Sequence, residues 1–107
     1  MKVYGDEYAR TGFQGGLQWY RCRTEGIGLG ELQIFSGQSI GVPSLFISGR
    51  SDWGNYQTVG AIERMQGTGC SDLRGVHQIE GAGHWVQQEK PNEVGRLLLE
   101  LLAATRT

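Results

Sequence analysis

The chain has 107 residues and a formal net charge of −1, and 38% of its residues are hydrophobic, which is typical of a folded globular domain. This balance excludes a strongly basic surface for phosphate backbones, so we expect no nucleic-acid partner. No apolar run approaches the length of a membrane span or of a signal-peptide core. We therefore expect a cytoplasmic protein that does not contact a membrane.

Glycine accounts for 18 residues and gathers in clusters that separate segments with a regular hydrophobic period. Residues 2–11 and 15–24 predict two short amphipathic helices. Residues 26–41 show no such period and predict an irregular connection. Residues 42–48, VPSLFIS, are a nearly continuous apolar run between two glycines, which is typical of a strand buried on both faces.

The second half of the chain alternates helical and extended patterns. A helix is predicted over residues 56–66, a short strand over 76–79 and a further helix that begins at Pro91. The last helix has apolar residues at helical spacing, namely Val94, Leu97, Leu98, Leu101 and Leu102. A strand–helix–strand–helix order implies parallel strands. Because two parallel strands are not stable alone, we expect this α/β unit to be the edge of a larger sheet.

An ionisable side chain follows each predicted strand. Asp52 lies in GRSDWG after the first strand, and His84 lies in EGAGHW after the second. Since parallel strands end at the same edge of a sheet, we expect the two side chains to be neighbours. A carboxylate beside an imidazole fixes the ring tautomer and lets the histidine act as a base. Each residue alone is also compatible with an ordinary turn, and the pairing favours catalysis.

The sequence before Asp52 has one match to the nucleophile pattern Gly-x-Ser-x-Gly, at Ser39. That pattern needs a strand before the serine and a helix after it, whereas a strand is predicted to follow here. We therefore interpret Ser39 as a turn residue. Cys22 and Cys70 have no histidine at metal-ligand spacing, so we expect no metal and no cofactor. In a reducing cytosol we expect two free thiols, and a disulfide between them is the alternative.

Three blocks of sequence resemble the C-terminal part of epoxide hydrolases of the α/β-hydrolase fold. They occur in the order of that family: GFQGGLQWYR at 12–21, VPSLFISGRSDWG at 42–54 and GAGHWVQQEKPNEV at 81–94. The resemblance implies a C-terminal fragment of that fold, with the end of a helical cap and the last two parallel strands and their helices. The cap part would be residues 1–25, the connecting loop 26–41 and the βαβα core unit 42–107.

The resemblance also implies a role for individual residues. Tyr20 matches a cap tyrosine that hydrogen-bonds the epoxide oxygen, Asp52 matches the charge-relay acid, and His84 matches the base that activates water. Trp53 and Trp85 match positions that can line the substrate cavity. Packing in the core is the alternative for all three aromatic residues. The implied reaction forms an alkyl-enzyme ester from the epoxide and an aspartate, and then hydrolyses the ester to a diol.

The family's nucleophile and oxyanion-hole loop lie upstream of the matched blocks, and no residues of this sequence match them. We therefore expect a fragment that is inactive by itself, with a small-molecule epoxide as the substrate of the complete enzyme. One alternative is a non-catalytic remnant that binds a ligand or self-associates through its exposed strand edge. Another alternative is a fragment of a dehalogenase or esterase on the same scaffold. The presence of Tyr20 disfavours it, because only epoxide opening needs an acidic hydroxyl from the cap.

Overall fold

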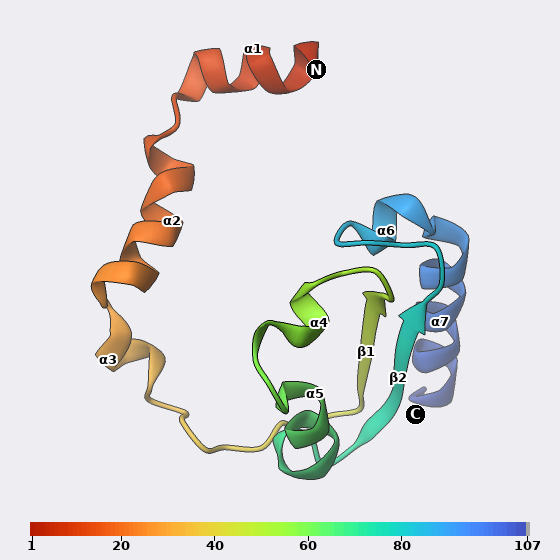
Figure 1. Ribbon diagram of the computed structural model, residues 1–107. Coiled ribbons are helices and arrows are strands. Elements are labelled where there is room, and N and C mark those ends of the chain that lie inside the picture. Colours follow the sequence, from red (N-terminus) through yellow and green to blue (C-terminus); the bar gives the residue numbers. More distant parts are fainter. Residues whose placement is uncertain (107) are drawn as a thin grey trace. The chain divides into compact units, whose positions relative to one another are not determined.

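The computed structural model describes residues 1–106. Its contacts divide the chain into two compact units between Ser36 and Gly37. Figure 1 shows that the first unit is helical and that the second contains both strands. Within residues 1–106, no helix combines the length and the apolar character that crossing a membrane requires.

The first unit consists of three helices. α1 spans Lys2–Thr11 and α2 spans Gln14–Glu25, as predicted, and each ends at a glycine with positive φ, Gly12 at 73° and Gly26 at 72°. α3 (Leu29–Leu32) is a single turn inside the segment that was predicted to be irregular. None of the side chains in these three helices is buried. The unit therefore has no hydrophobic core in its helical residues.

The second unit is built on two parallel strands. β1 spans Ser44–Gly49 and β2 spans Leu73–Ile79, and they pair from Ser44 opposite Leu73 to Gly49 opposite Ile79. The predicted parallel pair is confirmed. β2 begins at Leu73 rather than at residue 76, because main-chain pairing continues past the polar Arg74 that interrupts the apolar pattern.

The helix predicted between the strands is wrong as a continuous element. The structure has α4 (Gly54–Gln57) and, separately, α5 (Ala61–Arg64), which continues into the helical turn η1 (Met65–Gly69). The chain leaves helical geometry at Thr58, with φ −119° and ψ 108°, and Gly60 follows with φ 77°. This left-handed backbone conformation is readily adopted only by glycine, and it changes the direction of the chain between α4 and α5.

α7 spans Pro91–Ala104, as predicted, and follows the short helix α6 (Val86–Glu89). Leu97 of α7 belongs to the buried cluster, with Ile79, Ala82 and Val86. Partly buried side chains of β1 and α7 pack against this cluster, namely Leu45 and Ile47 of β1 and Val94 of α7. Burial of each large apolar side chain stabilises the fold by about 1.5–3 kcal/mol.

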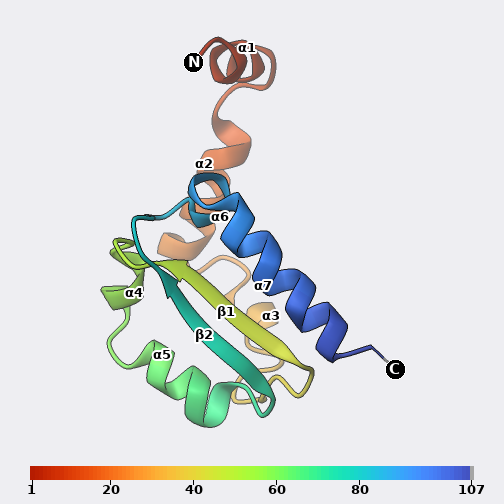
Figure 2. The same ribbon diagram turned by 90° about the vertical axis from the view of Figure 1, so that its right-hand side faces the viewer.

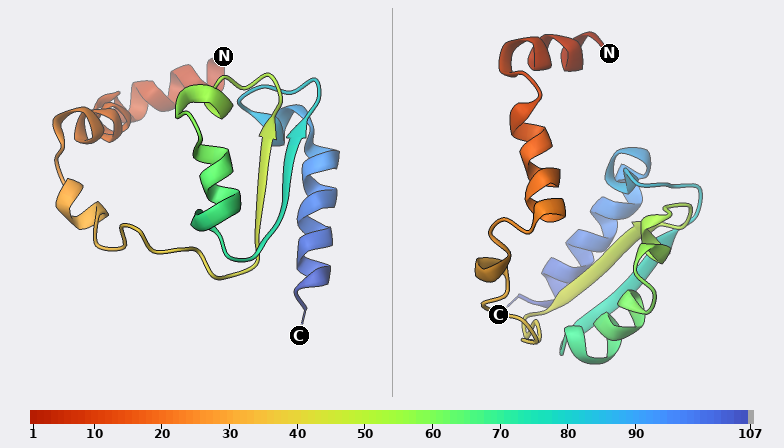
Figure 3. Two further views of the ribbon diagram at one scale, coloured as in Figure 1. Left: turned by 60° about the horizontal axis from the view of Figure 1, so that its bottom comes forward. Right: turned by 60° about the vertical axis from the view of Figure 1, so that its left-hand side comes forward.

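The sheet of the second unit has a helix layer on each side. Figures 2 and 3 show α7 along one face and the α4–α5 segment along the other. This arrangement agrees with the unbroken apolar run of β1, since alternating polar residues appear where one face of a strand meets solvent. The two parallel strands with their helices form an α/β arrangement.

Candidate functional site

The loops that follow β1 and β2 lie together at one edge of the sheet (Figure 1). The Arg50 N–H donates to the Ile79 carbonyl at 2.9 Å, and the Ser51 N–H donates to the Ala82 carbonyl at 3.0 Å. The side chains of Arg50 and Glu80 form an ion pair at 2.5 Å. These contacts hold the two loops side by side.

Gly49, the last residue of β1, lies directly against the loop that follows β2. A Cβ atom at this residue would lie 2.2 Å from the Gly83 carbonyl oxygen and 2.3 Å from the Ala82 carbonyl oxygen. Both are main-chain atoms, which cannot turn away as a flexible side chain can. The Asn55 side-chain amide also donates to the Gly49 carbonyl at 2.9 Å. Only glycine therefore allows this packing.

We expect Gly49→Ala to lower the free energy of unfolding by about 3 kcal/mol or more, because the new methyl group collides with main chain. Gly95→Ala is the matched control, since a Cβ at Gly95 in α7 meets nothing within 4 Å. In a helix interior that change is neutral or stabilising, by up to about 1 kcal/mol. Urea unfolding of the full chain, followed by circular dichroism, measures both. Equal midpoints for the two variants would contradict the steric argument.

Asp52 and His84 are brought together by these loops. The Asp52 side chain is 13% exposed, and its Oδ2 lies 3.2 Å from Nδ1 of His84. Its Oδ1 accepts the Gly54 N–H at 2.8 Å. Because an ionised carboxylate can only accept hydrogen bonds, this contact in a neutral imidazole requires the proton on Nδ1 and leaves the lone pair on Nε2. The arrangement is that of a base held by a carboxylate.

The three aromatic residues predicted for the site are all largely exposed. Trp85 packs edge-on against His84, with ring centroids 5.1 Å apart, and is 57% exposed. Trp53 follows Asp52 directly and is 67% exposed. Tyr20 lies on α2 in the first unit and is also 67% exposed. None of the three is buried within this chain, and their roles at a substrate remain predictions.

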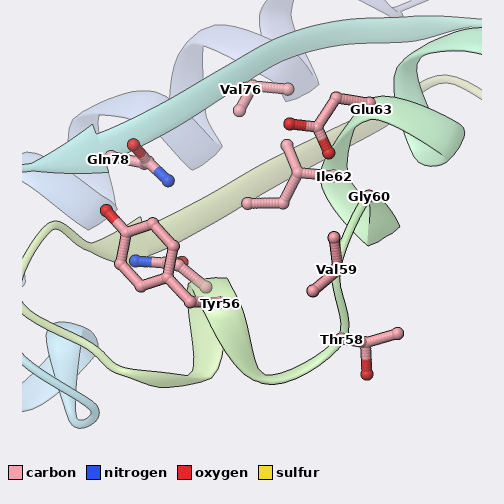
Figure 4. Close-up of a pocket in the computed structure, with 9 residues that line it drawn as sticks. Tyr56, Thr58, Val59, Gly60, Ile62, Glu63, Val76 and Gln78 are labelled. Carbon is pink, nitrogen blue, oxygen red and sulfur yellow. The ribbon is translucent and has the colours of Figure 1, made fainter.

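A pocket of about 400 Å³ lies elsewhere, between β2 and the α4–α5 segment. Figure 4 shows the side chains of Tyr56, Ile62 and Val76 around it. Asp52, His84 and the two tryptophans beside them do not line this pocket. The pocket therefore belongs to the packing of the helix layer on the sheet and not to the Asp52–His84 pair.

Ser39 lies in an irregular segment immediately before Ile40, which forms an isolated parallel bridge with Cys70. No helix leaves this position, which agrees with its interpretation as a turn residue. Cys22 is an exposed free thiol, and Cys70 is a buried one. Within residues 1–106, His84 has one side-chain hydrogen-bond partner, the Asp52 carboxylate.

Sequence reasoning missed the residues that hold the main chain of the two loops in place. Gly49 and Asn55 hold the end of β1, and Glu89 accepts the Gly83 N–H at 3.0 Å. The approach of Gly49 to Ala82 and Gly83 joins loops that are distant in sequence. The Asn55 and Glu89 contacts are local, but no motif in the sequence marks them. The glycine directly after the apolar run of β1 was the one visible signal.

Similarity to known proteins extends over nearly the whole chain. It is 38% identical to Epoxide hydrolase B of Mycobacterium tuberculosis over 107 residues, which cover 99% of this chain. It is 42% identical to Epoxide hydrolase A of the same organism over 99 residues, or 92% of this chain. The chain is related to the epoxide hydrolases. The resemblance found in the sequence blocks is thereby confirmed.

The chain spans about 29% of the length of these two epoxide hydrolases. It is also 29% identical to Bifunctional epoxide hydrolase 2 of Sus scrofa over 102 residues, which are 95% of this chain and 17% of that protein. No family model and no solved structure matches the chain.

Proposed function

We propose that this chain supplies the acid–base part of an epoxide-hydrolase active site on an α/β-hydrolase fold. The observation that carries the proposal is the contact of 3.2 Å between Oδ2 of Asp52 and Nδ1 of His84. The similarity to epoxide hydrolases supports the choice of reaction. We place this reaction in the cytoplasm because Cys22 and Cys70 are both unpaired, as is usual in a reducing compartment.

In the proposed reaction, His84 acts in the second of two steps. Its Nε2 takes a proton from water, and the resulting hydroxide attacks the carbonyl carbon of the alkyl-enzyme ester. Asp52 stabilises the imidazolium that forms. The ester bond then breaks and leaves the enzyme carboxylic acid and an alkoxide. This alkoxide takes the proton back from Nε2, and the alkoxide formed in the first step takes the proton of the carboxylic acid, so a diol and a free enzyme carboxylate result.

Tyr20 is proposed to act in the first step. There a carboxylate attacks one carbon of the epoxide, the carbon–oxygen bond breaks, and the Tyr20 hydroxyl donates a hydrogen bond to the developing alkoxide. The attacking carboxylate and the oxyanion hole are groups that this sequence does not supply. We therefore propose that residues 1–107 alone do not turn over epoxides.

The proposal is tested by transplanting the chain into a relative. In the chimera, this chain replaces the segment of Epoxide hydrolase B that it matches, and the substrate is an epoxide that the parent hydrolase converts. We expect diol from the chimera and none above buffer background from the 107-residue chain. A folded chimera that forms no diol would contradict the proposed function. Diol from the chain alone would contradict the need for an outside nucleophile.

A further inference from the structure

Glu89 reaches back across the loop that carries His84. It lies at the end of α6, where its own N–H donates to the Trp85 carbonyl at 2.9 Å. Its Oε2 accepts the Gly83 N–H at 3.0 Å, and its Oε1 lies 3.5 Å from the place that a Cβ on Gly83 would occupy. The carboxylate thus lies directly against Gly83.

The peptide group that joins Ala82 to Gly83 is held from both sides. Its C=O accepts the Ser51 N–H at 3.0 Å, from the loop that carries Asp52. Its N–H donates to Glu89 at 3.0 Å. In a planar trans peptide the C=O and the N–H point in opposite directions, so the two bonds together fix the orientation of the plane. This plane immediately precedes Gly83 and His84.

We propose that Glu89 is a positioning residue for His84. By clamping the Ala82–Gly83 peptide against the Ser51 N–H, it keeps Nδ1 of His84 within hydrogen-bond distance of Asp52. The positioning concerns this chain alone, while its consequence for turnover rests on the proposed function. We expect the length of the side chain at residue 89, and not its charge, to decide whether His84 is held, because the contact is a hydrogen bond to one main-chain N–H. Loss of the contact frees the plane to rotate, and His84 then samples orientations away from Asp52.

The test is nitrogen-15 NMR of the full chain with labelled histidine. The chain has two histidines, so His77 in β2 serves as an internal reference for folding. Glu89→Asp keeps the charge and shortens the reach, whereas Glu89→Gln keeps the reach and an acceptor oxygen. Glu93→Gln, in the first turn of α7, is the matched control. We expect the Nδ1–H tautomer of His84 in the parent chain, in Glu89→Gln and in Glu93→Gln, and a shift toward the Nε2–H tautomer in Glu89→Asp.

In the chimera, we expect Glu89→Asp to slow ester hydrolysis by about 10- to 100-fold, as misplacement of a reacting group does. Glu89→Gln should stay within about threefold of the parent, because one neutral hydrogen bond replaces a charged one. Ester formation should not change in either variant, because His84 acts only in the second step. A Glu89 with a merely structural role would change both steps together.

Unchanged His84 signals in Glu89→Asp would overturn the proposal, and so would equal changes in the Asp and Gln variants. Glu89→Ala provides a second truncation if the Asp variant also disturbs His77. Loss of the His77 signals in both truncated variants would overturn positioning in favour of a role in folding. A chimera that forms diol at the same rate after His84 is replaced would contradict the proposed function. The nitrogen-15 signals of His84 in the free chain would still test the role of Glu89.

Discussion

Replacement of His84 by glutamine in the chimera is expected to block ester hydrolysis and to leave ester formation intact. Glutamine has nearly the reach of histidine but cannot take a proton from water. A positioned general base contributes about 10²- to 10⁴-fold to the rate of such a step, and we expect a loss of that size. Mass spectrometry should then find the enzyme with one covalently attached substrate, which accumulates while diol formation stops.

His77→Gln is the matched control for this experiment. His77 is the other histidine of the chain and is half-buried in β2, on the face that meets α7. Its replacement changes the same functional group at a position away from Asp52. We expect the His77 variant to form diol without accumulating ester. Steady turnover by the His84 variant would show that the base is another group.

Asp52→Asn is expected to slow ester hydrolysis by about 10⁴-fold, although the side chain keeps its shape. The asparagine amide can turn its NH₂ group toward Nδ1 of His84, which then becomes the acceptor. The ring proton moves to Nε2, and the lone pair that should take the proton from water is lost. The nitrogen-15 spectrum should show this exchange of tautomers, together with accumulation of the ester.

Asp72→Asn provides the control for the aspartate change. Asp72 lies outside the site and pairs with Arg74 at 2.5 Å, and this hydrogen bond with the guanidinium holds the pKa of the Asp72 carboxyl below its usual range. Loss of this exposed pair should leave ester hydrolysis unchanged, because exposed ion pairs contribute little and Asp72 does not contact His84. An Asp52 variant that hydrolyses ester at the rate of the Asp72 variant would refute the role of Asp52.

Local patterns were sufficient where local interactions decide the structure. The apolar run before Gly49 predicted β1, and Pro91 with its leucines predicted α7, because each pattern reflects which faces an element buries. The same reasoning failed between the strands. Helical spacing across residues 56–66 does not reveal that Gly60 adopts a left-handed conformation with φ 77°, which separates α4 from α5.

The sequence by itself determined the order of the two strands and the last helix, the parallel pairing and hence the meeting of Asp52 with His84 at one sheet edge. This was possible because topology forces consecutive parallel strands to end on the same side. Only the tertiary structure decided which contacts keep the Asp52 and His84 loops together. The close approach at Gly49 and the bond from Ser51 to Ala82 depend on distances between loops that are some 30 residues apart in the chain, while Glu89 adds a contact within the second loop. No spacing along a sequence encodes such distances, since packing of the whole unit sets them.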